Sequence, residues 1–91
     1  MDSPTVITVY VLQSSRTGAW YVGITKDLAN RLDEHNHGES RATSPGRPWG
    51  LIYQEIQPDY GEARRREKYL KSTRGRNWLK NRLGLLDPHR P

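Results

Sequence analysis

The chain contains no cysteine, so neither a disulfide framework nor a zinc site with thiolate ligands can hold it together, and its redox compartment is unmarked. It has no apolar run near the roughly 18 residues that a membrane-spanning helix requires. Residues 1–4 lack the basic start and apolar stretch of a targeting segment, and internal repeats and low-complexity segments are absent. From these absences we expect a soluble, cytoplasmic protein with no membrane partner.

What the chain has in excess is positive charge. Its 15 lysines and arginines oppose 10 aspartates and glutamates, which gives a formal net charge of +5. A compact basic chain favours a polyanionic partner, most commonly nucleic acid, although charge alone only permits that function. The 91 residues fit one domain with a small core, expected over about residues 5–83 with a flexible tail over residues 84–91.

Residues 8–12 and 20–24 alternate as β-strands do, and residues 14–18 lie between them. We predict a hairpin in which Tyr10 pairs with Tyr21, away from the core. A simple interpretation of the two tyrosines is a cross-strand aromatic pair that stabilises the hairpin by roughly 0.2–1 kcal/mol. The other facing pairs in this register are all apolar: Val9 with Val22, Val11 with Trp20, and Ile7 with Ile24.

A helix is predicted after the hairpin, capped by Thr25 or Asp27 and ended near Gly38. Its core anchors are leucines 28 and 32, and Arg31 and His35, one turn apart, flank them. We therefore expect both polar side chains at the edge of the core, near the sheet. A border arginine is usually ion-paired or solvated and a lone histidine is usually structural, so a functional role for either is the alternative.

The second half of the chain predicts a loop, a strand and two helices. Residues 39–48 form the loop, and residues 49–56 form a third strand between two prolines. A helix capped by Asp59 runs over residues 61–72. Residues 74–76 break that helix, and residues 77–83 form a last short helix with Trp78, Leu79 and Leu83 as packing residues and Gly84 as its end. Residues 87–91 are an expected frayed tail, and residues 1–5 an expected loose lead-in.

The predicted order is β-β-α-β-α-α, an α+β fold in which a three-stranded antiparallel sheet is flanked by helices. On the helix predicted over residues 61–72, Glu67 shares one stripe with Ala63 and Leu70, where an apolar residue is expected. An unpaired buried carboxylate is costly. Glu67 is therefore either part of a buried ion pair, for example with Arg31, or a metal ligand at the floor of a cleft.

Several motifs occur in one order along the chain. Thr8-Val9-Tyr10 and Tyr21-Val22-Gly23 form a two-part signature, residues 28–32 read Leu-x-x-Arg-Leu, and residues 66–68 read Arg-Glu-Lys. Together they resemble the GIY-YIG nuclease superfamily, in particular small single-domain bacterial members related to the nuclease domain of the repair protein UvrC. The resemblance covers roughly residues 5–75 and implies the same fold.

The resemblance implies a divalent-metal-dependent endonuclease that hydrolyses DNA phosphodiester bonds in DNA repair or processing. Glu67 corresponds to the glutamate that binds one Mg²⁺ or Mn²⁺, and Arg31 to the arginine that stabilises transition-state charge. Tyr10 and Tyr21 correspond to the signature tyrosines, one polarising the attacking water and the other positioning it or the phosphate. His35 matches a histidine of many members and assists a proton transfer or contacts phosphate. Which tyrosine acts as the base stays open.

Basic side chains suit a phosphate track, although most can equally be a solvated face. No segment is typical of a module that reads bases in a DNA groove, so flap, branched and nicked DNA, RNA and a protein partner all stay open. The rival functions are a non-catalytic nucleic-acid-binding module or accessory factor, and a basic interaction protein whose Glu67 is only structural. The candidate nucleic-acid-binding residues are Lys26, Arg41, Arg47, Arg64, Lys68, Lys71 and Arg74.

Two positions depart from the family pattern. Thr8 stands where the first signature tripeptide has glycine, and Ile24 stands where UvrC-like members carry a lysine. A proton shuttle through that lysine cannot work identically here, although Lys26 lies nearby. The C-terminal asparagine of the family corresponds to Asn77 only if the intervening residues 74–76 are disregarded, so we favour a structural role for Asn77.

Overall fold

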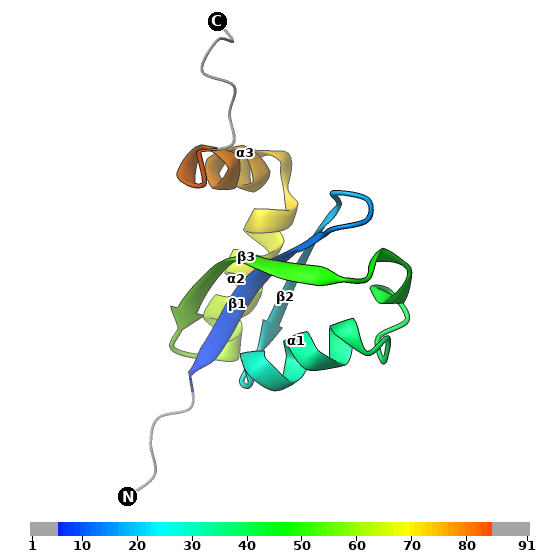
Figure 1. Cartoon of the computed structure of the whole chain (residues 1–91). Coiled ribbons are helices and arrows are strands. Elements are labelled where there is room, and N and C mark those ends of the chain that lie inside the picture. Colours follow the sequence, from blue (N-terminus) through cyan, green and yellow to red (C-terminus); the bar gives the residue numbers. More distant parts are fainter. Residues whose placement is uncertain (1–5, 85–91) are drawn as a thin grey trace, which may run out of the picture.

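The computed structural model describes residues 6–84, so the expected lead-in over residues 1–5 and all of the expected tail over residues 84–91 except Gly84 lie outside the described residues. The elements follow the predicted order (Figure 1). No helix in residues 6–84 is long and apolar enough to cross a bilayer. The elements are β1 (Ile7–Ser14), β2 (Trp20–Thr25), α1 (Leu28–Asn36), the short 3₁₀ helix η1 (Ser44–Gly46), β3 (Trp49–Gln57), α2 (Tyr60–Lys71) and α3 (Thr73–Arg82).

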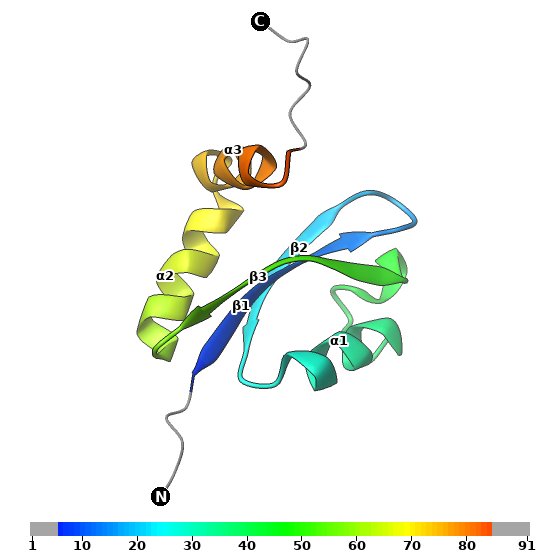
Figure 2. The same cartoon turned by 60° about the vertical axis from the view of Figure 1, so that its left-hand side comes forward.

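The three strands form an antiparallel sheet in the order β2-β1-β3, so β1 is central and β2 is an edge strand. Figure 2 shows α2 and α3 on one side of the sheet and α1 on the other. Side chains alternate between the two faces of a strand. Both faces of β1 are therefore buried, and the α+β fold expected from the sequence is confirmed.

Each face of β1 contributes to a separate apolar cluster. Ile7, Val9 and Val11 pack with Leu70 of α2 and Leu79 of α3. On the other face the cluster consists of Tyr10, Leu12 and Trp49, with Tyr21, Leu28 and Leu32 packed against it. The prediction that Tyr10 points away from the core was wrong, because α1 covers the second face and leaves Tyr10 only 1% exposed.

The predicted hairpin register was also wrong, by two residues. Tyr10 lies opposite Gly23, and Val11 lies opposite Val22, so the same side chains share a face but have different partners. The predicted register requires a two-residue turn with a positive φ at a non-glycine residue. In the structure the turn spans residues 15–18 instead, with the positive φ of 79° at Gly18.

The side chain of Ser14 shapes this longer turn. Its Oγ accepts hydrogen bonds from the backbone N–H of Arg16 at 3.1 Å and of Thr17 at 3.0 Å. The same Oγ donates to the carbonyl of Gly46 at 2.6 Å, which fastens the turn to the loop before β3. These bonds satisfy two backbone N–H groups of the turn and one backbone carbonyl of the loop.

Side-chain caps set the ends of the helices. Asp27 accepts from the backbone N–H of Asn30 at the start of α1, and Asp59 accepts from that of Glu62 at the start of α2, which confirms both predicted caps. Ser72 ends α2 and caps α3 by accepting from the N–H of Gly75 at 3.1 Å. The helices α2 and α3 therefore meet at one residue.

Gly75 was predicted to help break a helix, and that prediction was wrong. It is buried inside the first turn of α3, where a Cβ would clash with the carbonyl of Tyr69. The glycine allows close approach of α3 to α2 rather than interrupting a helix. As a result α3 begins at Thr73, four residues earlier than predicted. Leu79 is fully buried as expected, whereas Trp78 is 36% exposed.

Candidate active site

Tyr10, His35 and Thr43 form a buried chain of hydrogen bonds. The Tyr10 hydroxyl lies 2.9 Å from His35 Nε2, and His35 Nδ1 lies 2.7 Å from Thr43 Oγ1. Thr43 Oγ1 donates to the carbonyl of Ser40 at 3.5 Å. A hydroxyl can donate or accept, so the Tyr10 and Thr43 hydroxyls together satisfy both ring nitrogens of His35. No nitrogen of this buried imidazole is left without a hydrogen-bond partner.

Burial sets the protonation state of this chain of bonds. His35 is 0% exposed, and burial together with the charge of Arg31 lowers its pKa, which keeps the imidazole neutral at pH 7. Burial raises the pKa of Tyr10 to about 12. Tyr10 therefore keeps its hydroxyl hydrogen at neutral pH, and His35 lies deeper than the core edge where it was expected.

Asn36 and Trp49 hold the end of α1 against β3, and so fix His35. Asn36 Oδ1 accepts from the backbone N–H of Trp49 at 2.6 Å, and its Nδ2 donates to the carbonyl of Trp49 at 3.0 Å. The indole Nε1 of Trp49 donates to the carbonyl of Thr43 at 2.7 Å. These bonds join the helix, the strand and the loop on which the histidine depends.

Arg31 and Tyr21 complete one side of the site. The Tyr21 ring lies 4.9 Å from the His35 ring and 6.3 Å from the Tyr10 ring, measured between centroids. Burial opposes the charge of Arg31, but the hydroxyl groups of Tyr10 and Tyr21 more than offset it, so the arginine pKa lies above its ordinary value. The structure thus brings together four residues that the sequence singled out separately: Tyr10, Tyr21, Arg31 and His35.

Gly23 allows the Tyr10 side chain to reach the edge of the sheet. A Cβ at position 23 would come within 2.5 Å of the Tyr10 hydroxyl oxygen. Because β1 and β2 are neighbours and β2 is the edge strand, the tyrosine ring extends across this glycine toward the free edge. The glycine of the second signature tripeptide is therefore a steric requirement of the site.

Glu67 approaches from α2, on the opposite side of the sheet. Its side chain is 18% exposed and lies between the buried Ala63 and Leu70. Its negative charge contributes to the raised pKa of Tyr10. Its ion-pair partners are on its own helix: Lys71 Nζ at 3.1 Å and the more distant Arg64 at 3.9 Å. The partner suggested from the sequence, Arg31, instead lies 3.8 Å from Glu34.

A family model described as the GIY-YIG catalytic domain matches residues 6–81, which is most of the chain. The chain belongs to the GIY-YIG family. It is similar to a UPF0213 protein of Desulfotalea psychrophila, with 40% identity over 77 residues that cover 79% of this chain and 69% of that protein. It is also 37% identical over 65 residues to a UPF0213 protein of Staphylococcus aureus, covering 70% of this chain and 78% of that protein.

A solved structure supports the assignment of the fold. The solution NMR structure of a UPF0213 protein from Bacillus halodurans matches with a TM-score of 0.52 and 32% sequence identity, over 84% of this chain and 83% of that one. The resemblance to GIY-YIG proteins seen in the sequence is thereby confirmed.

The donor set of this GIY-YIG site fits a hard divalent cation. Residues 6–84 contain no cluster of three or more histidine, aspartate or glutamate side chains that could hold a metal. Both ring nitrogens of His35 are already hydrogen-bonded, to Tyr10 and Thr43. The carboxylate of Glu67 is close enough for its charge to raise the pKa of Tyr10, and its ion-pair partners within residues 6–84 are the exposed Arg64 and Lys71. A single carboxylate suits Mg²⁺ or Mn²⁺, which retain waters and take phosphate oxygens, and does not suit zinc, which needs three or four protein ligands.

The basic residues predicted to bind nucleic acid fall into separate groups. Arg64, Lys68 and Lys71 are exposed along α2 on either side of Glu67, and Arg74 follows at the start of α3. Lys26 is exposed in the loop between β2 and α1. The GIY-YIG site is therefore bordered by a basic row on α2.

Arg41 and Arg47 are not part of that row. Their loop lies beside α1, across the sheet from α2 (Figure 2). Arg47 Nε donates to the carbonyl of Ser44 at 2.9 Å, which gives this arginine a local structural role. Asn77 is exposed on α3.

Sequence reasoning missed Thr43, Trp20 and Arg76. Thr43 lies in a loop eight residues from His35, and its only signal is the rule that both nitrogens of a buried imidazole need partners. Trp20 was assigned only to the core, and Arg76 only to a helix break. In the GIY-YIG fold of this chain, Trp20 and Arg76 line one groove together with Tyr21 and Lys71.

Proposed function

We propose that this protein is a divalent-metal-dependent endonuclease that hydrolyses DNA phosphodiester bonds. The observation that supports this most directly is the convergence of Arg31 and two tyrosine hydroxyls at the sheet edge, with the carboxylate of Glu67 approaching from the other side. Phosphodiester hydrolysis needs an oriented water, positive charge for the transition state and a proton for the leaving oxygen. The chain offers a group for each of the first two needs.

Arg31 holds a non-bridging oxygen of the cleaved phosphate. Its side chain is about one-third exposed, and the hydroxyls of Tyr10 and Tyr21 act on its charge. The raised pKa keeps its charge at any physiological pH, and its planar donors match the geometry of a phosphate. The charge that develops on the phosphate is therefore stabilised from the α1 side of the site.

The two tyrosines have different roles. Tyr21 is partly exposed, and we assign it to the attacking water and the phosphate. Tyr10 is 1% exposed and is hydrogen-bonded to His35, so it positions Arg31 and Tyr21 rather than contacting substrate. His35 supports Tyr10 in turn through its second bond, to Thr43.

Glu67 is the residue that would hold the metal, with waters and a phosphate oxygen as the other ligands. A bound divalent ion supplies charge for the transition state and lowers the pKa of a coordinated water. Lys71 contacts the carboxylate at 3.1 Å in the free protein. Its side chain is 55% exposed, so this pair is weak, and Lys71 is able to turn to a phosphate when Glu67 takes another partner.

The second candidate function is a nucleic-acid-binding module without catalysis, which the basic row on α2 favours. A cleavage assay separates the two. Labelled single-stranded, duplex, nicked, flap and branched DNA, with matching RNA strands, would be incubated with Mg²⁺, Mn²⁺ or EDTA. We expect cleavage with either metal and none with EDTA. Binding to the panel without cleavage under any condition would support the module and reject the endonuclease.

A further inference from the structure

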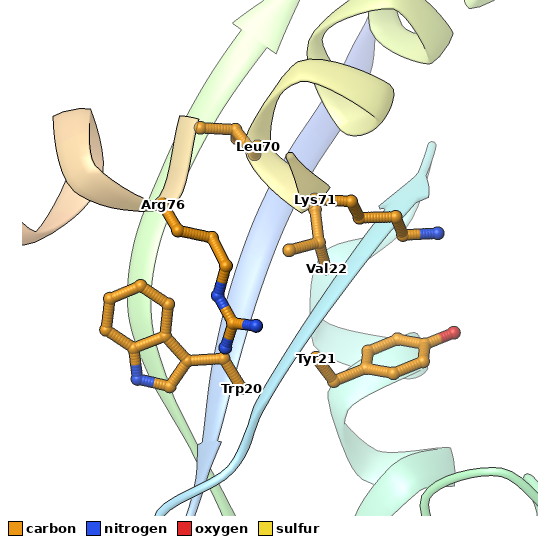
Figure 3. A pocket seen from close by; sticks show the side chains of 6 residues that line it. All are labelled: Trp20, Tyr21, Val22, Leu70, Lys71 and Arg76. Atoms are coloured by element: carbon orange, nitrogen blue, oxygen red, sulfur yellow. The ribbon is translucent and has the colours of Figure 1, made fainter. Parts of the chain in front are cut away.

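A groove opens at the β2 edge of the sheet, next to the candidate active site (Figure 3). Its volume is about 160 Å³, below the roughly 300–1,000 Å³ of typical small-molecule sites. A groove this small suits one part of a longer ligand. Its lining comes from three elements: Trp20, Tyr21 and Val22 of β2, Leu70 and Lys71 of α2, and Arg76 of α3.

Trp20 and Arg76 form the outer part of this groove. The guanidinium carbon of Arg76 lies 5.6 Å from the centre of the Trp20 ring, and the arginine is exposed. Within residues 6–84 the Arg76 side chain makes no ion pair and no hydrogen bond, so its N–H groups are available to a ligand. The inner face of Trp20 packs on the apolar cluster under α2.

A second arginine on aromatic rings shows the contrast. Arg66 lies 4.9 Å from the Trp78 ring and 5.1 Å from the Tyr69 ring, and it also makes two hydrogen bonds to Glu55, at 2.8 and 2.9 Å. The contacts of Arg66 therefore have a structural role, because they anchor Trp78 of α3. The pair of Trp20 and Arg76 has no such acidic partner in the described part of the chain.

The groove adjoins the candidate active site at the β2 edge. Tyr21 lines it, and in Figure 3 the side chains of Tyr21 and Lys71 project to the same side of β2, away from Trp20 and Arg76. Lys71 is one helical turn from Glu67 and is bonded to it. A strand of nucleic acid that meets Tyr21 and Glu67 therefore passes Lys71 and then Arg76.

We propose that this groove is a subsite for one unpaired nucleotide that flanks the cleaved phosphate. The nucleobase stacks on the outer face of Trp20, and Arg76 turns from the indole to the adjoining phosphate. Exposed cation–π contacts are weak, whereas base–aromatic stacking and a charge-assisted phosphate contact together favour the exchange. A base inside a duplex has no free face to offer, so the subsite selects a strand that is unpaired at this position. This assignment rests on the proposed nuclease site, because Tyr21 and Glu67 define its neighbouring phosphate.

Binding tests the subsite without requiring cleavage. The affinity of the full chain for a short fluorescein-labelled single-stranded DNA would be measured in EDTA by anisotropy, for wild type, Trp20→Ala and Arg76→Ala. Trp20→Ala should weaken binding roughly 5- to 150-fold, the range of losses for a stacked base. Arg76→Ala should weaken binding and reduce the dependence of log affinity on log salt by about 0.7, the value for one lost phosphate contact on a single strand.

Matched controls separate this role from general effects of charge or folding. Arg82→Ala removes the same charge from the exposed end of α3, and should leave the salt dependence within error of wild type. Thermal melting of each variant checks its fold, and Trp20→Tyr, which keeps an aromatic ring, should retain most of the affinity. The blunt duplex of the same sequence should bind wild type and Trp20→Ala equally.

Equal single-strand binding by wild type, Trp20→Ala and Arg76→Ala would overturn the subsite, as would a salt effect of Arg82→Ala that matches Arg76→Ala. These outcomes are independent of the nuclease assignment. Metal-dependent cleavage with no effect of Trp20→Ala on binding would reject the subsite and leave the nuclease intact. Trp20-dependent binding without cleavage would retain the groove as a binding site for an unpaired nucleotide, and would reject the nuclease together with the cleaved phosphate beside that site.

Discussion

Tyr10 and Gly23 face each other across the first two strands, and the absent side chain of the glycine is the space that the tyrosine ring occupies. This relationship joins the two halves of the GIY-YIG signature physically. The glycine lets the tyrosine extend toward the sheet edge, where its hydroxyl bonds to His35 at 2.9 Å. A small change at one residue should therefore disturb the other.

Gly23→Ala tests that relationship. The added Cβ would meet three atoms of the Tyr10 ring and hydroxyl at 2.5–3.0 Å, so the ring must move from His35. We expect a loss of about 1–3 kcal/mol in the free energy of unfolding, measured with urea. Gly50→Ala in β3 is the control, because a Cβ added there would have no atom within 4 Å and its effect should stay within about 0.5 kcal/mol. Equal effects of both substitutions would contradict the packing described.

The buried His35 predicts a loss of stability in acid. Burial, helped by Arg31, lowers its pKa, so the unfolded chain takes up a proton at a higher pH than the folded chain does. Stability from this group is therefore complete above the ordinary pKa of about 6.5 and falls as the pH drops below it. Melting temperatures measured between about pH 8 and pH 5 should fall more for wild type than for His35→Gln.

The exposed His37 provides the matched control for that measurement. His37→Gln should follow the wild-type profile, since its side chain is 67% exposed and bonded only to neighbours on its own helix. If His35→Gln shows the same acid-induced fall as wild type, His35 is not the group responsible.

The elements could be predicted because their signals are local. Asp27 and Asp59 cap helices through bonds to residues three positions away, and these bonds need no tertiary contact. The hairpin register could not, because it depends on how Ser14 bonds to its turn and to the distant Gly46. The burial of Tyr10 depends on α1 covering the second face of the sheet, which alternation within one strand does not reveal.

Within the candidate site, the motif order was enough to single out Tyr21, Arg31 and Glu67, but not the contacts around them. The bond from His35 to Thr43 joins a helix to a loop with no periodic pattern, so no local sequence pattern identifies Thr43 as the partner. The partner of Glu67 was sought on another element, yet Lys71 lies one turn along the same helix, a spacing at which opposite charges commonly pair.

Substitution of each tyrosine by phenylalanine separates contact from positioning. Tyr21→Phe should reduce cleavage by about 10²-fold or more with little change in melting temperature, because the proposed mechanism assigns its hydroxyl to the attacking water. Tyr10→Phe should lower the free energy of unfolding by about 1–3 kcal/mol, because Nε2 of His35 stays buried without a hydrogen-bond partner. Cleavage rates and urea denaturation of both variants are the measurements. A larger catalytic loss and unchanged stability for Tyr10→Phe would reverse the two roles.

Lys71→Ala tests the competition for Glu67. The lysine is exposed, so its pair with Glu67 contributes less than about 1 kcal/mol and its removal should tighten Mn²⁺ binding by no more than about fivefold. Electron paramagnetic resonance of free Mn²⁺ in the absence of DNA measures this affinity. Lys68→Ala is a control with the same change of charge on the same helix. Weaker Mn²⁺ binding by Lys71→Ala alone would contradict the proposed competition.

The most direct measurement is metal-dependent DNA cleavage by Glu67→Ala, compared with wild type and with Glu62→Ala. Glu62 is an exposed glutamate of the same helix that pairs with Arg65. We predict that Glu67→Ala keeps its melting temperature and its DNA binding in EDTA but loses cleavage, while Glu62→Ala cleaves as wild type does. Undiminished cleavage by a folded Glu67→Ala protein would contradict the assignment of Glu67 as the metal ligand, and with it the proposed mechanism.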